Sequence, residues 1–360
     1  MIKYGTRLIV DQNDYRNTRS ISSSSPTLED LNDGQVLLKI GDWAYTSNNT
    51  TYAVVGHMIG YWKFFPVEEE GYGIIPCWGF ADVVASNAEG VTVGDRVYGY
   101  FPMASHLIVE PVNVSPNGFI DGAAHRAQLP VIYNQYTQCA NDPLYHKDAE
   151  SLQALYRPLF TTSFLIRDLF EQESFFGSKQ VVVTSASSKT AMSLAFCLKD
   201  DPVEVIGLTS PSNVENVVNS GLYDQVYSYD DFKNIPEGAS SIVDFAGNHK
   251  LLFDVEHHLM PNLKYVCLVG FVHWESDKAE EKLPLKGIMF FAPSYAAERV
   301  KQLGPAEFNR RLATKYMSFI QSVKDKISIV RHNGIEALAS FHQKITDGDL
   351  NANEGHIIKL

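Results

Sequence analysis

The second half of the chain alternates between two kinds of apolar pattern. Short continuous apolar runs predict buried strands, and helix-like segments such as AMSLAFCLKD and HKLLFDVEHHL lie between them; the runs are QVVVTS, VEVIGLTS, SSIVDFAG and KYVCLVGF. Such alternation is typical of βαβ units, in which helices cover a parallel sheet. We therefore expect a Rossmann-like, doubly wound α/β domain that binds a dinucleotide over residues 151–295.

The first part of the chain has short strand-like segments and many turns. VLLKI, FADVVAS and VGDRVYGY are separated by Gly, Asn and Pro, which predicts a β-rich domain. Residues 115–148 show no clean period, but their Tyr and other apolar residues argue against disorder, so we expect an irregular, ordered insertion or lid. The chain ends in a predicted helix, strand, helix and strand. We assign residues 1–150 and 296–360 to the β-rich domain.

Composition and charge exclude several classes of function. The chain has 360 residues, 45% hydrophobic and 20% charged, with a net charge of -12 and no Lys/Arg-rich run, which argues against a nucleic-acid partner. Its four cysteines are widely separated and match no zinc spacing or disulfide framework. No apolar run reaches the ~18 residues of a membrane span. We expect a cytoplasmic protein that acts on a small molecule, without a membrane partner.

Segments along most of the chain resemble the medium-chain dehydrogenase/reductase superfamily. GVTVGDRVYGYFPMASHLIVEP is similar to the segment where those proteins carry V-x-V-G-D-R-V before a strand that ends in Pro. VVVTSASSKTAMSLAF falls where they carry V-T-G-A-x-G-G-V-G, and GIEALASFHQKITDGDLNANEGHIIKL resembles their closing helix and strand. The zinc-free quinone and enoyl reductases of the superfamily are the most similar.

This resemblance implies an architecture and an activity. A Rossmann-like domain would bind NADP, and a GroES-like β-rich domain would carry the catalytic residues. The activity would be zinc-independent transfer of hydride from NADPH to a conjugated enone, quinone or enoyl thioester. Proteins with this pattern are commonly homodimers.

The strand-to-helix turn of the predicted cofactor site lacks the usual glycines. Ser185, Ser188, Lys189 and Ala191 stand where Gly is usual. Ser and Ala allow close approach of a pyrophosphate if φ stays negative, Ser hydroxyls can donate to phosphate oxygens, and Lys189 supplies a positive charge. The alternative is that the site has decayed and Lys189 is only a solvated residue at the start of a helix.

The end of the second strand bears on the choice of nicotinamide. It carries no Asp or Glu to bind a ribose 2′-hydroxyl, which favours NADPH. The resemblance adds a Tyr near the 2′-phosphate and the turns after the fourth and fifth strands. The predicted cofactor-binding residues are Ser185, Ser187, Ser188, Lys189, Thr190, Thr209, Ser210, Ser212, Asn213, Tyr229, Asp244, Gly247 and Gly270. Taken one at a time, the residues at the end of the second strand are equally explained as an ordinary polar loop, and turn geometry is the alternative for Asp244, Gly247 and Gly270.

The segment TSNNTTY is the predicted catalytic site. Zinc-dependent relatives carry a Cys in this region, which this chain lacks, and Cys77 stands outside the G-H-E pattern of their His, so we expect no catalytic zinc. Zinc-free reductases carry N-P-x-D here, where Asn49 matches the Asn and Tyr52 falls at the Asp. A Tyr hydroxyl can bond a carbonyl oxygen and pass a proton. The alternative is that Asn49 is a turn residue and Tyr52 packs.

Two further segments predict a substrate pocket. YWKFFP would supply an aromatic wall, and GIMFFAPSYAAER would face the cleft between the domains, with Arg299 holding a carboxylate or phosphate. The predicted residues are Tyr61, Trp62, Phe291, Ser294, Tyr295 and Arg299. Core packing and a surface or ion-paired Arg are the alternatives.

Two rival functions stay open. One is a non-catalytic dinucleotide-binding or scaffold protein with a degenerate loop. The other is a carrier or small-molecule binding module that uses the aromatic cleft without any nucleotide.

Overall fold

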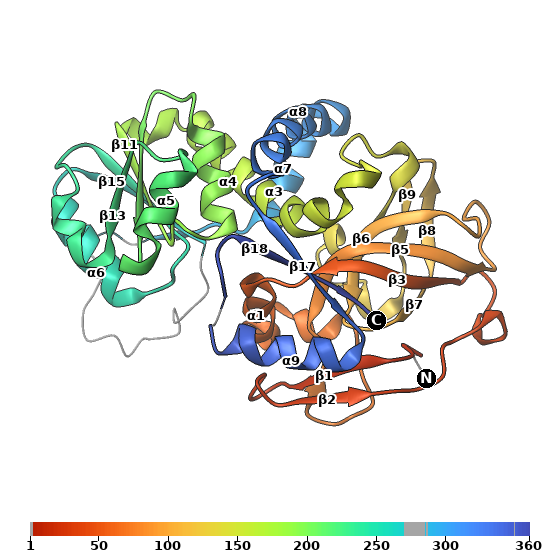
Figure 1. Cartoon of the computed structure of the whole chain (residues 1–360). Helices are drawn as coiled ribbons and strands as arrows, with labels where there is room; N and C mark the ends of the chain where they lie inside the picture. The colour runs from red at the N-terminus through yellow and green to blue at the C-terminus, as the bar shows by residue number, and fades with distance from the viewer. Residues whose placement is uncertain (1–2, 270–284, 286, 349) are drawn as a thin grey trace. The chain divides into compact units, whose positions relative to one another are not determined.

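The chain divides into two compact units. The computed structural model describes residues 3–269, 285, 287–348 and 350–360 (Figure 1). A β-rich unit comprises Met1–Pro158 and Ile320–Leu360, and a Rossmann-like unit comprises Leu159–Phe319. The unit boundaries fall inside helix α3 (Glu150–Gln172) and helix α8 (Pro305–Val323). The domain boundaries expected at residues 151 and 296 remain a prediction, which limited proteolysis can test.

The Rossmann-like unit is built on a six-stranded sheet in the order β13-β12-β11-β14-β15-β16, in which every pairing is parallel. Its strands are β11 (Gln180–Thr184), β12 (Glu204–Thr209), β13 (Gln225–Ser228), β14 (Ser240–Asp244), β15 (Leu263–Leu268) and β16 (Ile288–Met289). The strand order reverses at β11, and ligands of open α/β sheets bind at such a switch point. The expectation of a Rossmann-like doubly wound sheet is confirmed.

Helices follow most strands of this sheet, and the central strands β11 and β14 are buried along their whole length. These helices are α4 (Lys189–Leu198), α5 (Val214–Ser220) and α6 (His249–Leu259), with α7 (Ala292–Leu303) after β16. Val182, Ile206 and Ile242 from three neighbouring strands are buried together in one core cluster. Strands that are buried on both faces read as continuous apolar runs, which explains the sequence pattern.

The β-rich unit contains a nine-stranded sheet and a three-stranded sheet. The larger has the order β17-β18-β3-β5-β6-β10-β9-β8, with β7 paired to β3, and the smaller has the order β2-β1-β4. The strands are β1 (Arg7–Asp11), β2 (Thr18–Ile21), β3 (Val36–Ala44), β4 (Tyr72–Gly73), β5 (Pro76–Ser86), β6 (Arg96–Pro102), β7 (His106–Val109), β8 (Pro111–Ser115), β9 (Gly118–Asp121), β10 (Gln135–Gln138), β17 (Ser328–Asn333) and β18 (Glu354–Lys359). Its helices are α1 (Ser47–Val54), α2 (Gly56–Ile59) and α9 (Ile335–Thr346). The predicted β-rich domain is confirmed.

The segment 115–148 continues the larger sheet. Strand β9 pairs with β8 and β10, and β10 pairs with β6. Buried Arg126 ties the segment together, because it donates to Asp121 at 2.7 Å and to Asn134 at 2.9 Å. The segment therefore contains regular strands, where the sequence analysis expected an irregular insertion. Strands of four residues are too short to show a period in the sequence.

Candidate functional site

The turn between β11 and α4 keeps a glycine-like backbone without a glycine. Ser185 has φ 51, in the left-handed region that glycine adopts freely. The condition stated above for close approach of a pyrophosphate, a negative φ, is therefore not met at Ser185. A glycine on the neighbouring strand allows this close packing, because a Cβ on Gly207 would lie 3.1 Å from the Cβ of Ala186 and 3.0 Å from the ring of Tyr223. The Tyr223 hydroxyl donates to the carbonyl oxygen of Ala186 at 2.8 Å.

Helix α4 begins at the end of this turn with a side-chain cap. Ser188 is the N-cap, and its hydroxyl oxygen accepts a hydrogen bond from the N–H of Ala191 at 3.2 Å. Lys189 and Thr190 form the start of the helix and are half-buried. The partial positive charge of a helix N-terminus favours a bound anion. The turn thus brings the residues predicted to contact the phosphates to one place.

A hydroxyl group at the end of β12 hydrogen-bonds the β11–α4 turn. Thr209 donates to the hydroxyl oxygen of Ser187 at 3.3 Å. Beyond it, the side-chain amide of Asn213 donates to the hydroxyl of Ser210 at 2.9 Å, and the hydroxyls of Ser210 and Ser212 lie 3.3 Å apart. Neutral donors rather than a carboxylate therefore occupy the end of this strand.

Tyr229 also reaches the turn. Its hydroxyl group hydrogen-bonds Ser185, and burial raises the pKa of the phenol in spite of this bond. The ring is half-buried. The Tyr that the resemblance places near a 2′-phosphate thus contacts the residue with the left-handed backbone.

Asp244 and Gly247 shape the turn after β14. The carboxylate of Asp244 accepts from the Thr184 hydroxyl at 2.6 Å and from the N–H of Gly247 at 3.0 Å. Burial raises the pKa of this carboxyl group. These bonds join the ends of β11 and β14, which are adjacent in the sheet. The third residue predicted for these turns, Gly270, lies outside the described residues.

In the β-rich unit, Asn49 is part of a helix cap. Its Oδ1 atom accepts from the N–H of Thr46 at 2.9 Å, and its amide donates to the carbonyl oxygen of Pro76 at 2.9 Å. Thr46 and Asn49 form the capping box of α1, and Asn49 is 4% exposed. These bonds fasten the start of α1 to β5, so Asn49 is a helix residue rather than the turn residue of the alternative interpretation.

Tyr52 lies one turn further along α1, inside an aromatic cluster. Its ring centroid is 4.6 Å from that of Tyr61 and 5.6 Å from that of Tyr100. The indole N–H of Trp78 donates to its hydroxyl oxygen at 3.3 Å. Burial raises the pKa of Tyr52, so the phenol stays protonated at neutral pH. Tyr61 shares this cluster, and its hydroxyl lies 2.9 Å from that of Tyr133.

The four residues predicted on the segment GIMFFAPSYAAER lie at the start of α7 and along it. Arg299 is buried, and its Nε atom lies 2.6 Å from the Asp168 carboxylate. The hydroxyl of Tyr295 donates to the same carboxylate at 2.9 Å. Phe291 is the half-buried N-cap of α7, and Ser294 is exposed. Arg299 is therefore an ion-paired residue, which is the alternative stated for it above.

Comparison with known proteins begins with the sequence. A profile of the family described as "Protein of unknown function (DUF2855)" matches residues 43–351. The chain belongs to the DUF2855 family. Among curated proteins, none matches it.

Solved structures of low sequence identity have the same fold as this DUF2855 protein. CurA in complex with NADPH from Vibrio vulnificus has a TM-score of 0.59 at 14% identity, with 100% of this chain and 98% of that chain covered. The yhdH oxidoreductase from Salmonella enterica in complex with NADP has a TM-score of 0.57 at 14% identity, with 99% of each chain covered. The quinone oxidoreductase from Coxiella burnetii has a TM-score of 0.57 at 15% identity, also with 99% of each chain covered. The resemblance to the medium-chain superfamily is confirmed at the level of the fold.

The structure also bears on the question of a metal. Among the described residues of the DUF2855 protein, no three His, Cys, Asp or Glu side chains are grouped so that they could hold a metal ion. Cys77 is buried, its thiol lies 3.4 Å from the carbonyl oxygen of Phe101, and burial raises its pKa. Zinc independence remains a prediction. In the same described part of the chain, no helix is long and apolar enough to cross a membrane.

Sequence reasoning missed two residues that shape the β11–α4 turn of the DUF2855 protein. Gly207 and Tyr223 lie against Ala186, yet neither stands in the β11–α4 segment. The sequence did carry a signal for Gly207, because an isolated glycine inside a strand such as VIGLT marks a close approach of another part of the chain.

Proposed function

We propose that this protein is a zinc-independent, NADPH-dependent reductase that transfers hydride to a conjugated enone, quinone or enoyl thioester. The observation that carries the proposal is the β11–α4 turn, where Ser185 takes a left-handed backbone and Ser188 caps the helix. A left-handed residue before a capped helix start supports the binding of phosphates at this turn, although the usual glycines are absent. The NADPH and NADP complexes named among the similar structures support the choice of cofactor.

The residues present fit a dinucleotide at this turn. Hydroxyls of Ser187 and Thr190 and the start of α4 would hold the phosphates, and Lys189 would add positive charge. Segment Thr209–Asn213 has hydroxyl and amide donors and no carboxylate, which suits a 2′-phosphate better than a bare ribose diol. When bound, NADPH would supply the hydride.

Tyr52 is the residue that we propose to polarise the substrate. Its hydroxyl accepts a hydrogen bond from Trp78 and also hydrogen-bonds the side chains of Asn48 and Tyr100, so the proposed mechanism requires its proton to turn to a carbonyl oxygen of the substrate. Burial keeps that proton in place at neutral pH. A donor at this oxygen stabilises the negative charge that develops there when hydride adds to the conjugated system.

Turnover of NADPH with an enone, a quinone and an enoyl thioester tests the activity. Tyr52→Phe should lower kcat roughly 100-fold while the Kd for NADPH stays within twofold. Tyr15→Phe, in the same unit, is the control and should leave kcat unchanged. An unaltered kcat in Tyr52→Phe would remove Tyr52 from the mechanism.

A second candidate, a non-catalytic dinucleotide-binding or scaffold protein, is favoured by a different observation. Asn49, Arg299 and Asp244 were predicted to serve ligands, and all three are bonded to other parts of the protein. Binding of NADPH without its consumption by any of the three substrate classes would support this second function. We further propose that the protein works as a cytoplasmic homodimer, which light scattering and cell fractionation can test.

A further inference from the structure

Two histidines on neighbouring strands near the end of the chain are hydrogen-bonded to each other. His332 lies on β17 and His356 on β18, and the Nε2 atom of His332 is 3.2 Å from the Nδ1 atom of His356. Strands β17 and β18 and helix α9 between them are the last elements of the chain and are drawn in blue in Figure 1. His356 is buried and His332 is half-buried. The proposed reductase activity uses neither residue.

The ring of Phe341 on α9 packs against both imidazoles. Its centroid is 4.3 Å from that of His332 and 4.2 Å from that of His356. Phe341 is itself buried, and it meets the ring of Tyr45 edge-on at 5.6 Å. The two histidines therefore lie against an apolar surface, which solvates a positive charge poorly.

The hydrogen bond between the two rings depends on their protonation. A neutral imidazole has one N–H donor and one acceptor nitrogen, whereas a protonated imidazole has two donors. The bond therefore forms when at least one ring is neutral. When both rings are protonated, two N–H groups and two positive charges face each other, and the attraction becomes a repulsion.

The charges around the pair accommodate one proton better than two. The carboxylate of Glu354 on β18 lies 3.6 Å from the Nε2 atom of His356. Burial and then the charge of Lys344 on α9 lower the pKa of His332, and Glu354 acts in the opposite direction. One carboxylate balances one positive charge on the pair, and Lys344 opposes a second.

Two further ionisable side chains of this region are bonded elsewhere. His342 on α9 is buried, and its ring bonds the hydroxyl of Tyr45 and a backbone carbonyl oxygen. Arg331 precedes His332 on β17, so it points to the other face of the sheet, where it pairs with Asp42. Among these groups, the bond between His332 and His356 is the one that a second proton breaks.

Strand β17 is the element that this repulsion would release. It is an edge of the nine-stranded sheet and pairs with β18 alone among the described strands. The chain enters it from α8, the helix within which the Rossmann-like unit ends and the β-rich unit resumes. An edge strand has one ladder of hydrogen bonds, so it opens locally more easily than a central strand.

We propose that His332 and His356 form an acid-sensitive switch, which holds β17 to β18 at neutral pH and lets β17 open when both rings are protonated. The pKa of His332 is lowered in the closed form, so the closed form binds fewer protons than the open form. Opening therefore becomes easier as the pH falls through the ~6.5 of an isolated imidazole. The switch contains no residue of the β11–α4 turn or of α1, so it does not depend on the proposed function.

Hydrogen–deuterium exchange of the whole protein tests the switch at about pH 7.5 and about pH 5.0, on either side of the pKa of an isolated imidazole. After correction for intrinsic exchange rates, protection of the peptide that covers β17 should fall about tenfold at the lower pH, because closing the strand then brings two positive charges together. Protection of β11, a central strand of the other unit, should change by less than about twofold.

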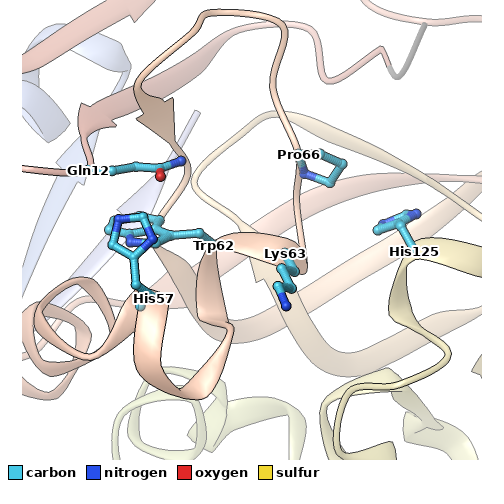
Figure 2. Close-up of a pocket in the computed structure, with 7 residues that line it drawn as sticks. Gln12, His57, Trp62, Lys63, Pro66 and His125 are labelled. Carbon is cyan, nitrogen blue, oxygen red and sulfur yellow. The ribbon is translucent and has the colours of Figure 1, made fainter.

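Variants assign the response to the pair. His332→Gln keeps an amide near the position of Nε2, and His356→Asn keeps one near the position of Nδ1, but neither amide takes up a proton. In each variant the protection of β17 should be the same at both pH values. His57→Gln is the control, because His57 is an exposed histidine of the same unit; Figure 2 shows it across an open cavity from His125. This variant should keep the tenfold change.

Equal protection of β17 at both pH values in the original protein would overturn the proposal. So would a loss of protection at low pH that persists in His332→Gln or His356→Asn, since His342 or another group would then be responsible. If a variant does not fold, ¹⁵N NMR titration of the histidine rings in the original protein decides: two protonated rings with β17 still protected would contradict the switch. Failure of the reductase proposal would leave all these measurements unaffected.

Discussion

The β11–α4 turn and the Thr46–Tyr52 segment both depart, in opposite ways, from the pattern of the medium-chain superfamily that the sequence resembles. In the turn the expected glycines are gone, yet the left-handed backbone at Ser185 and the cap at Ser188 are present. In the segment the expected Asn49 is present, yet its amide is bonded to Thr46 and Pro76. The turn lacks the glycines of the medium-chain pattern but has a left-handed residue and a capped helix, whereas Asn49 matches that pattern and its side chain is bonded within the fold.

This difference shows how two kinds of site tolerate change. A phosphate site made from backbone N–H groups and a helix start survives substitution wherever the backbone conformation survives. A catalytic site made from side chains needs those atoms within hydrogen-bond reach of the substrate. The proposed function therefore rests on backbone geometry for its cofactor and on Tyr52 alone for its chemistry.

The largest expected effect concerns Arg299, which we assign to the fold rather than to a ligand. Arg299→Met leaves the carboxylate of Asp168 buried without its cation, so the free energy of unfolding should fall by about 3 kcal/mol in urea titrations. Arg310→Met breaks the exposed ion pair with Glu307 in the same unit and should change the free energy of unfolding by less than about 0.5 kcal/mol. Equal stability of the two variants would contradict the structural role of Arg299.

The next effect concerns Asn49 and the start of α1. Asn49→Ala should lower the free energy of unfolding by about 2 kcal/mol, because it removes a helix cap and leaves the carbonyl oxygen of Pro76 without this bond. Ser47→Ala, at the exposed first residue of α1, is the control. A stable Asn49→Ala protein that has lost turnover would instead make Asn49 catalytic.

At the cofactor turn, Lys189 is predicted to act through its charge. Lys189→Glu should raise the Kd for NADPH about tenfold, equivalent to about 1.4 kcal/mol, because it places a negative charge beside the phosphates. Lys199→Glu makes the same change at the exposed, opposite end of α4 and should leave the Kd unaltered. If the Kd for NADPH is the same in both variants as in the original protein, the start of α4 does not hold the phosphates.

The smallest effect separates the backbone of Ser185 from its hydroxyl. Ser185→Gly should be about 1 kcal/mol more stable to unfolding than Ser185→Ala, because glycine adopts the left-handed conformation without strain. Both variants remove the hydroxyl that bonds Tyr229, so this loss cancels in the comparison. In both variants the Kd for NADPH should stay within twofold of the value for the original protein. A higher Kd in both variants would show that the hydroxyl is needed for binding.

The sequence revealed the parallel sheet because its strands are buried on both faces and read as continuous apolar runs. It could not reveal the left-handed φ of Ser185, since serine alone favours negative φ and the packing against Gly207 and Tyr223 decides the turn. Nor could it pair Arg299 with Asp168, which are 131 residues apart. The role of Asn49 was readable, since Thr followed three residues later by a residue that can bond back is a capping pattern.

The central claim is that a turn without glycines holds the phosphates of NADPH. A thermal-shift titration of the purified protein with NADPH, NADH and ATP side by side tests it most directly. NADPH at 100 times its Kd should stabilise the protein by about 2.7 kcal/mol, and NADH and ATP should give smaller shifts. No shift with any of the three nucleotides would contradict the claim, and the fold would then serve a function without a dinucleotide.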